Sequence, residues 1–234
     1  MQEKSRSIRK EGLSASDQAY NGIIDLVLHH ELRPGERTSV NLLADRLNLG
    51  RTPVKEAISR LETEGVLSVA GRSGTTVKTI DAKTARHLFA LRRNLEGFAV
   101  QEAVQHVTAD DIVTLRELFD QLQDTTTDTV NFYQDAARYV KANVRFHAAL
   151  VAAAHNPILD RLYVQIQMQA QIVVYLYHLG TNSSTIASRQ REHASILAAL
   201  EERNAPKLTR LLDAHVRATE AGVLHALANS AVFS

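Results

Sequence analysis

Beyond Asp81 the sequence shows no β-strand pattern comparable to the one that precedes it, and this feature constrains the fold most. Apolar residues there recur at the three- and four-residue spacing of amphipathic helices. Glycine and proline, which interrupt helices, number only 10 and 4 in 234 residues. We therefore predict an all-α antiparallel six-helix bundle, with helices at 82–105, 109–125, 129–154, 157–179, 184–203 and 206–229.

The first third of the chain has a different pattern. Helical spacing predicts one helix from about Ser16 and a short one over 40–47. A third helix is predicted to begin with Thr52 as its N-cap and Pro53 as its first residue. Short β-prone runs on either side of a Gly-rich turn then predict a hairpin over 67–80. Helix, turn, helix and hairpin form the plan of a winged helix-turn-helix, so the expected fold class is mainly α.

These patterns divide the chain into three expected regions. They are a flexible basic arm over 1–15, a winged helix-turn-helix domain over 16–80, and an effector-binding and dimerisation domain over 81–234. The chain has no cysteine, which excludes disulfides and thiolate metal ligands. No secretory signal or membrane span is evident, so the expected location is the cytoplasm, with no membrane partner.

The third helix carries the candidate DNA-binding residues. Arg51, Thr52 and Lys55 lie at its start, and Ser59 lies one turn further along the same face. Long cations at a helix start can contact guanine or phosphates, and Arg72 at the hairpin tip can reach a minor groove. The alternative is a solvated charged surface, because the net charge of +1 does not itself indicate a nucleic-acid partner.

The segments 32–37, 43–47 and 50–67 resemble the GntR family of bacterial transcriptional regulators. The third segment reads Gly-Arg-Thr-Pro-Val-Lys-Glu-Ala-Ile, where the family commonly has Ser-Arg-Thr-Pro-Val-Arg-Glu-Ala-Leu. Gly50 and Lys55 are departures that remove a hydroxyl and a bidentate guanidinium. The resemblance implies binding to double-stranded operator DNA, and palindromic half-sites imply a homodimer.

The second half resembles the FCD effector domain of the FadR branch, in its six-helix VanR-like form. The matching segments are 91–97, 145–157, Glu192 with His193, and His215 with Val216. Family members place an Arg near Arg92 to bind a carboxylate effector, such as a sugar, hydroxy or aromatic acid. The alternative role for Arg92 is an i,i+4 salt bridge with Glu96.

Three histidines of the predicted bundle form a candidate metal site. Asn143 and His147 share a helix face, with Tyr139 one turn earlier as a candidate effector contact. His193 lies on the predicted helix 184–203 and His215 on the predicted helix 206–229. The interior of a helix bundle can bring histidines from three helices together. Imidazoles suit divalent zinc or nickel. The alternative is three unrelated core or surface histidines.

In metal-containing FCD domains, the ligands are an Asp, a His four residues later, and one His from each of the last two helices. His147, His193 and His215 match the histidines, whereas Asn143 stands at the Asp position and offers a neutral oxygen.

The sequence therefore predicts a ligand-responsive transcriptional regulator, expected to be a repressor, with no catalytic residues. One alternative is a regulator that senses the metal ion directly. Another is a metal-dependent enzyme, which a site with open positions could support. The enzyme is disfavoured because no motif places a Glu or Asp beside His147, His193 or His215 as a general base.

Overall fold

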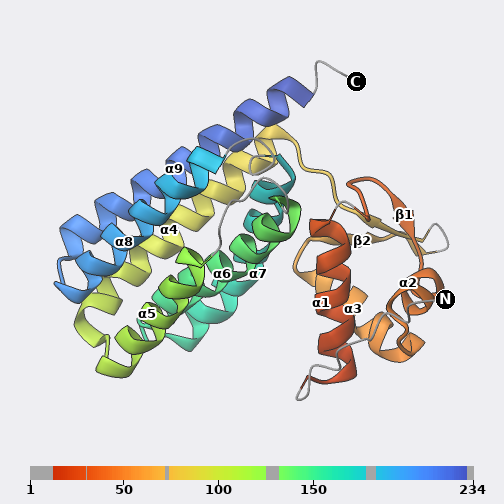
Figure 1. The fold of residues 1–234 in the computed structure, drawn as a ribbon, viewed down its shortest axis with the longest axis horizontal. Helices are drawn as coiled ribbons and strands as arrows, with labels where there is room; N and C mark the ends of the chain where they lie inside the picture. Colours follow the sequence, from red (N-terminus) through yellow and green to blue (C-terminus); the bar gives the residue numbers. More distant parts are fainter. Residues whose placement is uncertain (1–12, 30, 72–73, 125–131, 178–182, 231–234) are drawn as a thin grey trace, which may run out of the picture.

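A computed structural model describes residues 13–29, 31–71, 74–124, 132–177 and 183–230. Its N-terminal part contains three helices and three short strands (Figure 1). These elements are α1 (Ala15–Leu28), β1 (Arg37–Thr38), α2 (Val40–Leu47), α3 (Arg51–Thr63), β2 (Leu67–Val69) and β3 (Thr75–Val77).

Side-chain caps fix the starts of two of these helices. Ser14 accepts the N–H of Asp17 at the start of α1, and Ser39 accepts the N–H of Leu42 at the start of α2. Helix α3 corrects the prediction, because its N-cap is Gly50 rather than Thr52 and has no side-chain cap bond. The Gly50 carbonyl accepts the N–H of Val54, so Pro53 lies within the first turn, where a missing N–H costs nothing.

The predicted hairpin is present and forms part of an antiparallel sheet with strand order β1-β3-β2. Leu67 pairs with Val77 and Val69 with Thr75, while Arg37 of β1 pairs with Thr76. Two residues are too few to show a strand alternation, so β1 had no sequence signal. Arg72, which the sequence predicts at the hairpin tip, lies outside the described residues.

The C-terminal part is a bundle whose described helices match the six predicted ones. Helix α4, the long helix that follows the wing, packs against α9, α7 and α6. Asp81 caps α4, and Thr108 with Asp111 forms a capping box at α5. The helices are α4 (Ala82–His106), α5 (Ala109–Gln123), α6 (Phe132–Ala152), α7 (Pro157–Tyr177), α8 (Ser183–Glu201) and α9 (Ala205–Ser230).

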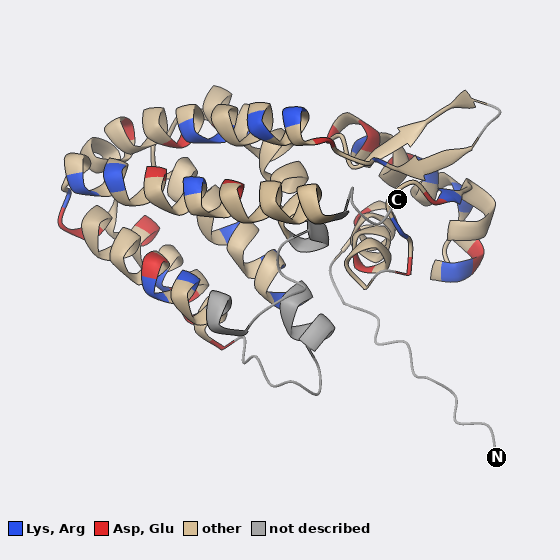
Figure 2. Ribbon diagram, turned by 90° about the horizontal axis from the view of Figure 1, so that it is seen from above, with Lys and Arg blue, Asp and Glu red and all other residues tan. Residues whose placement is uncertain are grey.

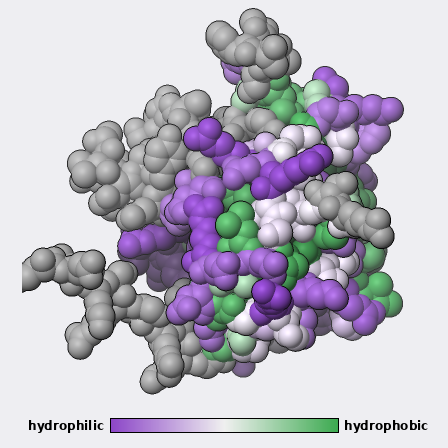
Figure 3. All heavy atoms as spheres, turned by 90° about the vertical axis from the view of Figure 1, so that its right-hand side faces the viewer, coloured by the Kyte–Doolittle hydropathy of each residue, from purple (hydrophilic) through white to green (hydrophobic). Residues whose placement is uncertain are grey.

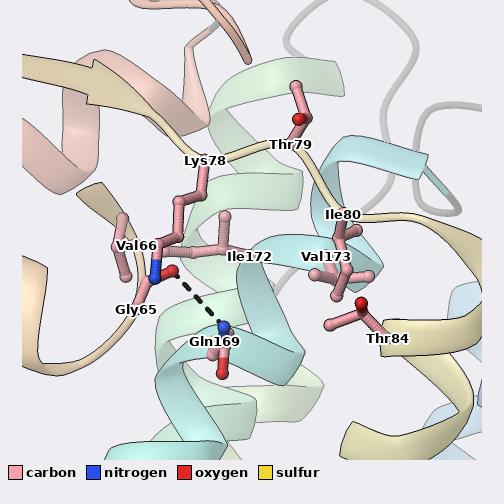
Figure 4. Close-up of a pocket in the computed structure, with 9 residues that line it drawn as sticks. All are labelled: Gly65, Val66, Lys78, Thr79, Ile80, Thr84, Gln169, Ile172 and Val173. Carbon is pink, nitrogen blue, oxygen red and sulfur yellow. Dashed lines mark hydrogen bonds between the residues drawn. The ribbon is translucent and has the colours of Figure 1, made fainter. Parts of the chain in front are cut away.

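Helix α1 contacts α6 and α7, and this contact joins the two parts of the molecule. Lys141 of α6 forms an ion pair with Asp25 of α1. Gln169 of α7 donates a hydrogen bond of 3.4 Å to the carbonyl of Gly65, beside a pocket of about 260 Å³ at the junction (Figure 4). Gly65 needs its positive φ of 73° to turn the chain from α3 into the wing.

Charged residues of both signs are interspersed along the helices of the bundle (Figure 2). No described helix combines the length and the apolar character that a membrane span requires.

Candidate functional site

The candidate DNA-reading residues of α3 share one exposed surface. Arg51, Thr52, Lys55 and Ser59 are all exposed. The opposite face of α3 is buried through Val54, Ala57, Ile58 and Leu61. The end of the molecule that carries the winged helix is hydrophilic over much of its surface, with apolar residues between (Figure 3). The amphipathic pattern therefore places these four side chains where they are free to meet a ligand.

Arg60, also on α3, has a different role. Its guanidinium lies 4.0 Å from the ring centre of Tyr20 and 3.1 Å from a carboxylate oxygen of Glu64. Tyr20 in turn donates a 2.5 Å hydrogen bond to Glu64. Arg60 therefore holds α3 against α1, which distinguishes it from the cations at the start of the helix.

The bundle interior brings together the three predicted histidines. His147 of α6 and His193 of α8 are fully buried, and His215 of α9 is 4% exposed. One ring nitrogen from each lies within 4.8 Å of the others, and the Nε2 atoms of His147 and His193 are 3.1 Å apart. The predicted juxtaposition of helices that are far apart in the sequence is therefore present in the structure.

The 3.1 Å separation of His147 and His193 suits a shared metal ion. Two nitrogens bound at about 2.1 Å are separated by roughly 3.0 to 3.4 Å for coordination angles between octahedral and tetrahedral. Burial lowers the pKa of all three histidines well below the usual value, and the positive charge of Arg92 adds to the effect. The imidazoles are therefore neutral near pH 7, which is the form that binds metals.

Asn143 and Tyr139 line a small cavity beside this cluster. The Oδ1 atom of Asn143 is buried and has no hydrogen-bond partner among the described residues. Such an orphaned oxygen fits a fourth ligand position. The cavity has a volume of about 20 Å³, and Arg92, Gln171, Val174, Arg189, His215 and Thr219 complete its lining.

Arg92 forms the salt bridge that the sequence left open as an alternative. Its Nε atom donates to Glu96 at 2.7 Å, and both side chains are almost completely buried. Burial disfavours the charged guanidinium, but Glu96 and Tyr163 outweigh it and raise the pKa of Arg92. Its Nη2 atom has no partner in the part of the chain that the structure describes. Arg92 therefore combines a structural contact with a donor still available at the cavity.

Two carboxylates beside the histidines correct the sequence analysis. Glu192 lies 2.6 Å from Nδ1 of His215, and Glu96 lies 3.5 Å from Nδ1 of His147. The sequence offers little indication of these two contacts. Glu192 is adjacent to His193 rather than His215, and Glu96 lies one helical turn after Arg92. Neither signal indicates which histidine each carboxylate meets, because that depends on how the helices pack.

Comparison with known proteins identifies both parts of the chain. Residues 15–77 match the family described as "Bacterial regulatory proteins, gntR family", and residues 87–218 match the FCD domain. The chain is a member of the GntR family with an FCD domain.

Relatives of the chain are named as transcriptional regulators. It is 27% identical to the uncharacterized HTH-type transcriptional regulator YdhC of Bacillus subtilis, over 80% of this chain and 81% of that protein. It is 28% identical to the Nta operon transcriptional regulator of Aminobacter aminovorans, over 82% and 86%. The structure of Escherichia coli McbR/YncC covers 91% of this chain and 98% of its own, with a TM-score of 0.74 and 24% identity.

This GntR-family chain is accordingly a transcriptional regulator, as the sequence predicted, and its matched domains are not those of an enzyme. The described bundle also agrees with the expected six-helix FCD fold.

Proposed function

We propose that this protein is a homodimeric repressor that binds operator DNA through α3 and responds to a small carboxylate held at a metal centre in the bundle. The observation that carries this proposal is a cluster of three neutral, buried histidines beside a small cavity that His215, Asn143 and Arg92 line. Among the described residues, Oδ1 of Asn143 and Nη2 of Arg92 are buried without a hydrogen-bond partner.

In this proposal, His147, His193, His215 and Asn143 hold a divalent zinc or nickel ion. The ion supplies a Lewis-acid position for a carboxylate oxygen of the effector. Arg92 uses its free Nη2 to pair with the carboxylate, and Tyr139 offers a hydroxyl. Burial raises the pKa of Tyr139, so this hydroxyl stays protonated and can donate a hydrogen bond.

The size of the cavity explains how binding changes the protein. About 20 Å³ holds a single water-sized group, whereas an organic acid has several heavy atoms. The acid therefore binds only if the helices around the cavity separate. A ligand that requires this separation shifts the population towards the opened bundle.

Two contacts connect the cavity to the DNA-binding part. Lys141 precedes Asn143 by two residues on α6 and pairs with Asp25 of α1. Gln169 precedes Gln171 by two residues on α7 and binds the carbonyl of Gly65, just after α3. A displacement of α6 or α7 therefore changes the position of α1 and α3.

The proposed dimer needs an exposed apolar surface. Leu91 and Phe98 lie two helical turns apart on α4 and are 47% and 51% exposed. Replacing both with Asp is expected to lower the mass measured by sedimentation from dimer to monomer, with the helical circular dichroism retained. A dimer that persists in this variant would exclude α4 as the interface.

The function is tested by a thermal-shift screen of organic acids on zinc-loaded protein. Binding to the native state raises the unfolding temperature by mass action, so at least one acid is expected to stabilise the wild type. Arg92→Lys retains the positive charge but loses the planar guanidinium that can donate two hydrogen bonds to one carboxylate. This variant is therefore expected to lose most of the shift in unfolding temperature. Arg93→Lys is the matched control, because Arg93 pairs with Glu220 instead. Equal shifts in all three proteins would remove Arg92 from the effector site.

The small cavity also supports the second candidate, a direct metal sensor. Operator binding by chelated protein, zinc-loaded protein and zinc-loaded protein with the stabilising acid separates the two. The effector account expects a change in operator affinity only when the acid is added. A change caused by zinc alone, with no further effect of acid, would favour the sensor.

A further inference from the structure

A histidine that binds a metal through Nε2 carries its proton on Nδ1, and this proton needs an acceptor. The acceptor is usually a carboxylate or a backbone carbonyl, which fixes both the tautomer and the orientation of the ring. The surroundings of Nδ1 in each histidine therefore indicate whether the cluster is built for a metal.

His215 has such an acceptor already in place. Its Nδ1 lies 2.6 Å from Oε2 of Glu192, which is 34% exposed. Arg189 lies 3.2 Å from the same oxygen and also donates a 2.9 Å hydrogen bond to the carbonyl of His215. Arg189 therefore holds Glu192 and the backbone of α9 together and orients the ring of His215.

His147 has a second carboxylate within reach. Its Nδ1 lies 3.5 Å from Oε1 of Glu96, which also accepts hydrogen bonds from Arg92 at 2.7 Å and Tyr163 at 2.5 Å. Among the described residues, both Nδ1 of His147 and Oε2 of Glu96 are buried without a hydrogen-bond partner. A small rotation that joins these two atoms would satisfy both, which is favourable because each unpaired buried group costs free energy.

His193 differs from the other two histidines. Its Nδ1 is buried without a hydrogen-bond partner among the described residues. Two of the three histidines, His147 and His215, thus have a carboxylate near the nitrogen opposite the proposed metal.

We propose that Glu96 and Glu192 are positioning residues of the metal centre, each holding one histidine with Nε2 directed at the ion. This inference rests on the proposed metal site. Each carboxylate is itself paired with an arginine, Glu96 with Arg92 and Glu192 with Arg189. Their contribution to the site is therefore the orientation of the rings and the acceptance of the Nδ1 proton, rather than added negative charge.

The test measures metal affinity in the full-length, metal-free protein by competition with a chromophoric chelator, using Zn²⁺ and Co²⁺. Glu192→Gln removes the charge at a half-exposed position and preserves the shape of the side chain. Its expected effect is a loss of affinity of about 10- to 100-fold, the range typical of such outer ligands. Glu202→Gln, an exposed change just beyond α8, is the matched control and should bind as the wild type does.

The visible spectrum of the Co²⁺ protein supplies a readout that a purely structural role would not change. Glu192→Gln is expected to shift its ligand-field bands, because the orientation of His215 changes, while the unfolding temperature of the metal-free protein stays within a few degrees of the wild type. Glu96→Gln should weaken binding similarly. If that variant does not fold, because Arg92 loses its buried partner, Glu192→Gln alone decides.

Two results would overturn the inference, and they are distinguishable. A wild type that binds neither ion removes the metal site itself and this inference with it. A wild type that binds both ions, together with a Glu192→Gln variant of equal affinity and unchanged spectrum, leaves the metal site intact and removes the positioning role.

Discussion

At the scale of single residues, Asn143 is the most informative position. Its Oδ1 atom is buried and has no hydrogen-bond partner among the described residues. Asn143→Asp replaces the amide nitrogen with a second oxygen, so it adds a negative charge at nearly constant size. With a metal present, the variant should bind zinc more tightly than the wild type. Without a metal, the added buried charge should lower the free energy of unfolding by up to about 3 kcal/mol, with Arg92 and Arg189 at the same cavity offsetting part of the cost. Thermal unfolding with and without zinc measures both effects, and destabilisation that zinc does not relieve would count against the site.

The same scale shows what the sequence could not specify. The i,i+4 spacing of Asn143 and His147, and of Arg92 and Glu96, follows from helical geometry alone and was predictable. The contact between Glu192 and His215 depends on how α8 packs against α9, and no spacing within one helix encodes it. The sequence thus predicted the histidine cluster through family resemblance but did not reveal the carboxylates beside it.

At the scale of elements, helix periodicity and caps predicted the described helices closely, because each signal is local. Ser14 and Asp81, for example, each accept a backbone N–H at the start of a helix. The prediction was wrong at the start of α3, where Gly50 rather than Thr52 is the N-cap. The backbone changes from extended to helical at Gly50, and no side chain caps the helix there. The strand β1 was missed because pairing with β3, rather than its own two residues, defines it.

The start of α3 supports a prediction about DNA. Lys55→Ala should weaken operator binding and reduce the slope of log affinity against log salt by about 0.9, the value for one lost phosphate contact. Arg51→Ala should cost about 1 to 3 kcal/mol if Arg51 contacts a base. Arg86→Ala, an exposed change on α4, is the matched control. Wild-type affinity in both α3 variants, measured by fluorescence anisotropy across salt concentrations, would show that another surface reads the operator.

At the scale of the whole molecule, the described contacts that connect the bundle to the DNA-binding part include an ion pair and a hydrogen bond of modest strength. Lys141 and Asp25 are 40% and 38% exposed, so their ion pair stabilises the junction by no more than about 1 kcal/mol. Lys141→Ala should therefore leave zinc affinity unchanged and reduce the effect of the acid on operator binding less than about fivefold. Adding Gln169→Ala should reduce it further, because the bond to Gly65 is also lost. An undiminished effect in the double variant would place the coupling elsewhere.

The central claim is that binding of the acid in the bundle and binding of operator DNA affect each other. The most direct test is to measure how one ligand changes the affinity for the other. The measurement is the affinity of zinc-loaded protein for the acid that stabilises it most, with and without saturating operator DNA. Because coupling between two sites is reciprocal, the acid should bind more weakly to the DNA complex, by the same factor by which it lowers operator affinity. Equal affinities in the two states, in a protein that binds both ligands, would contradict the account.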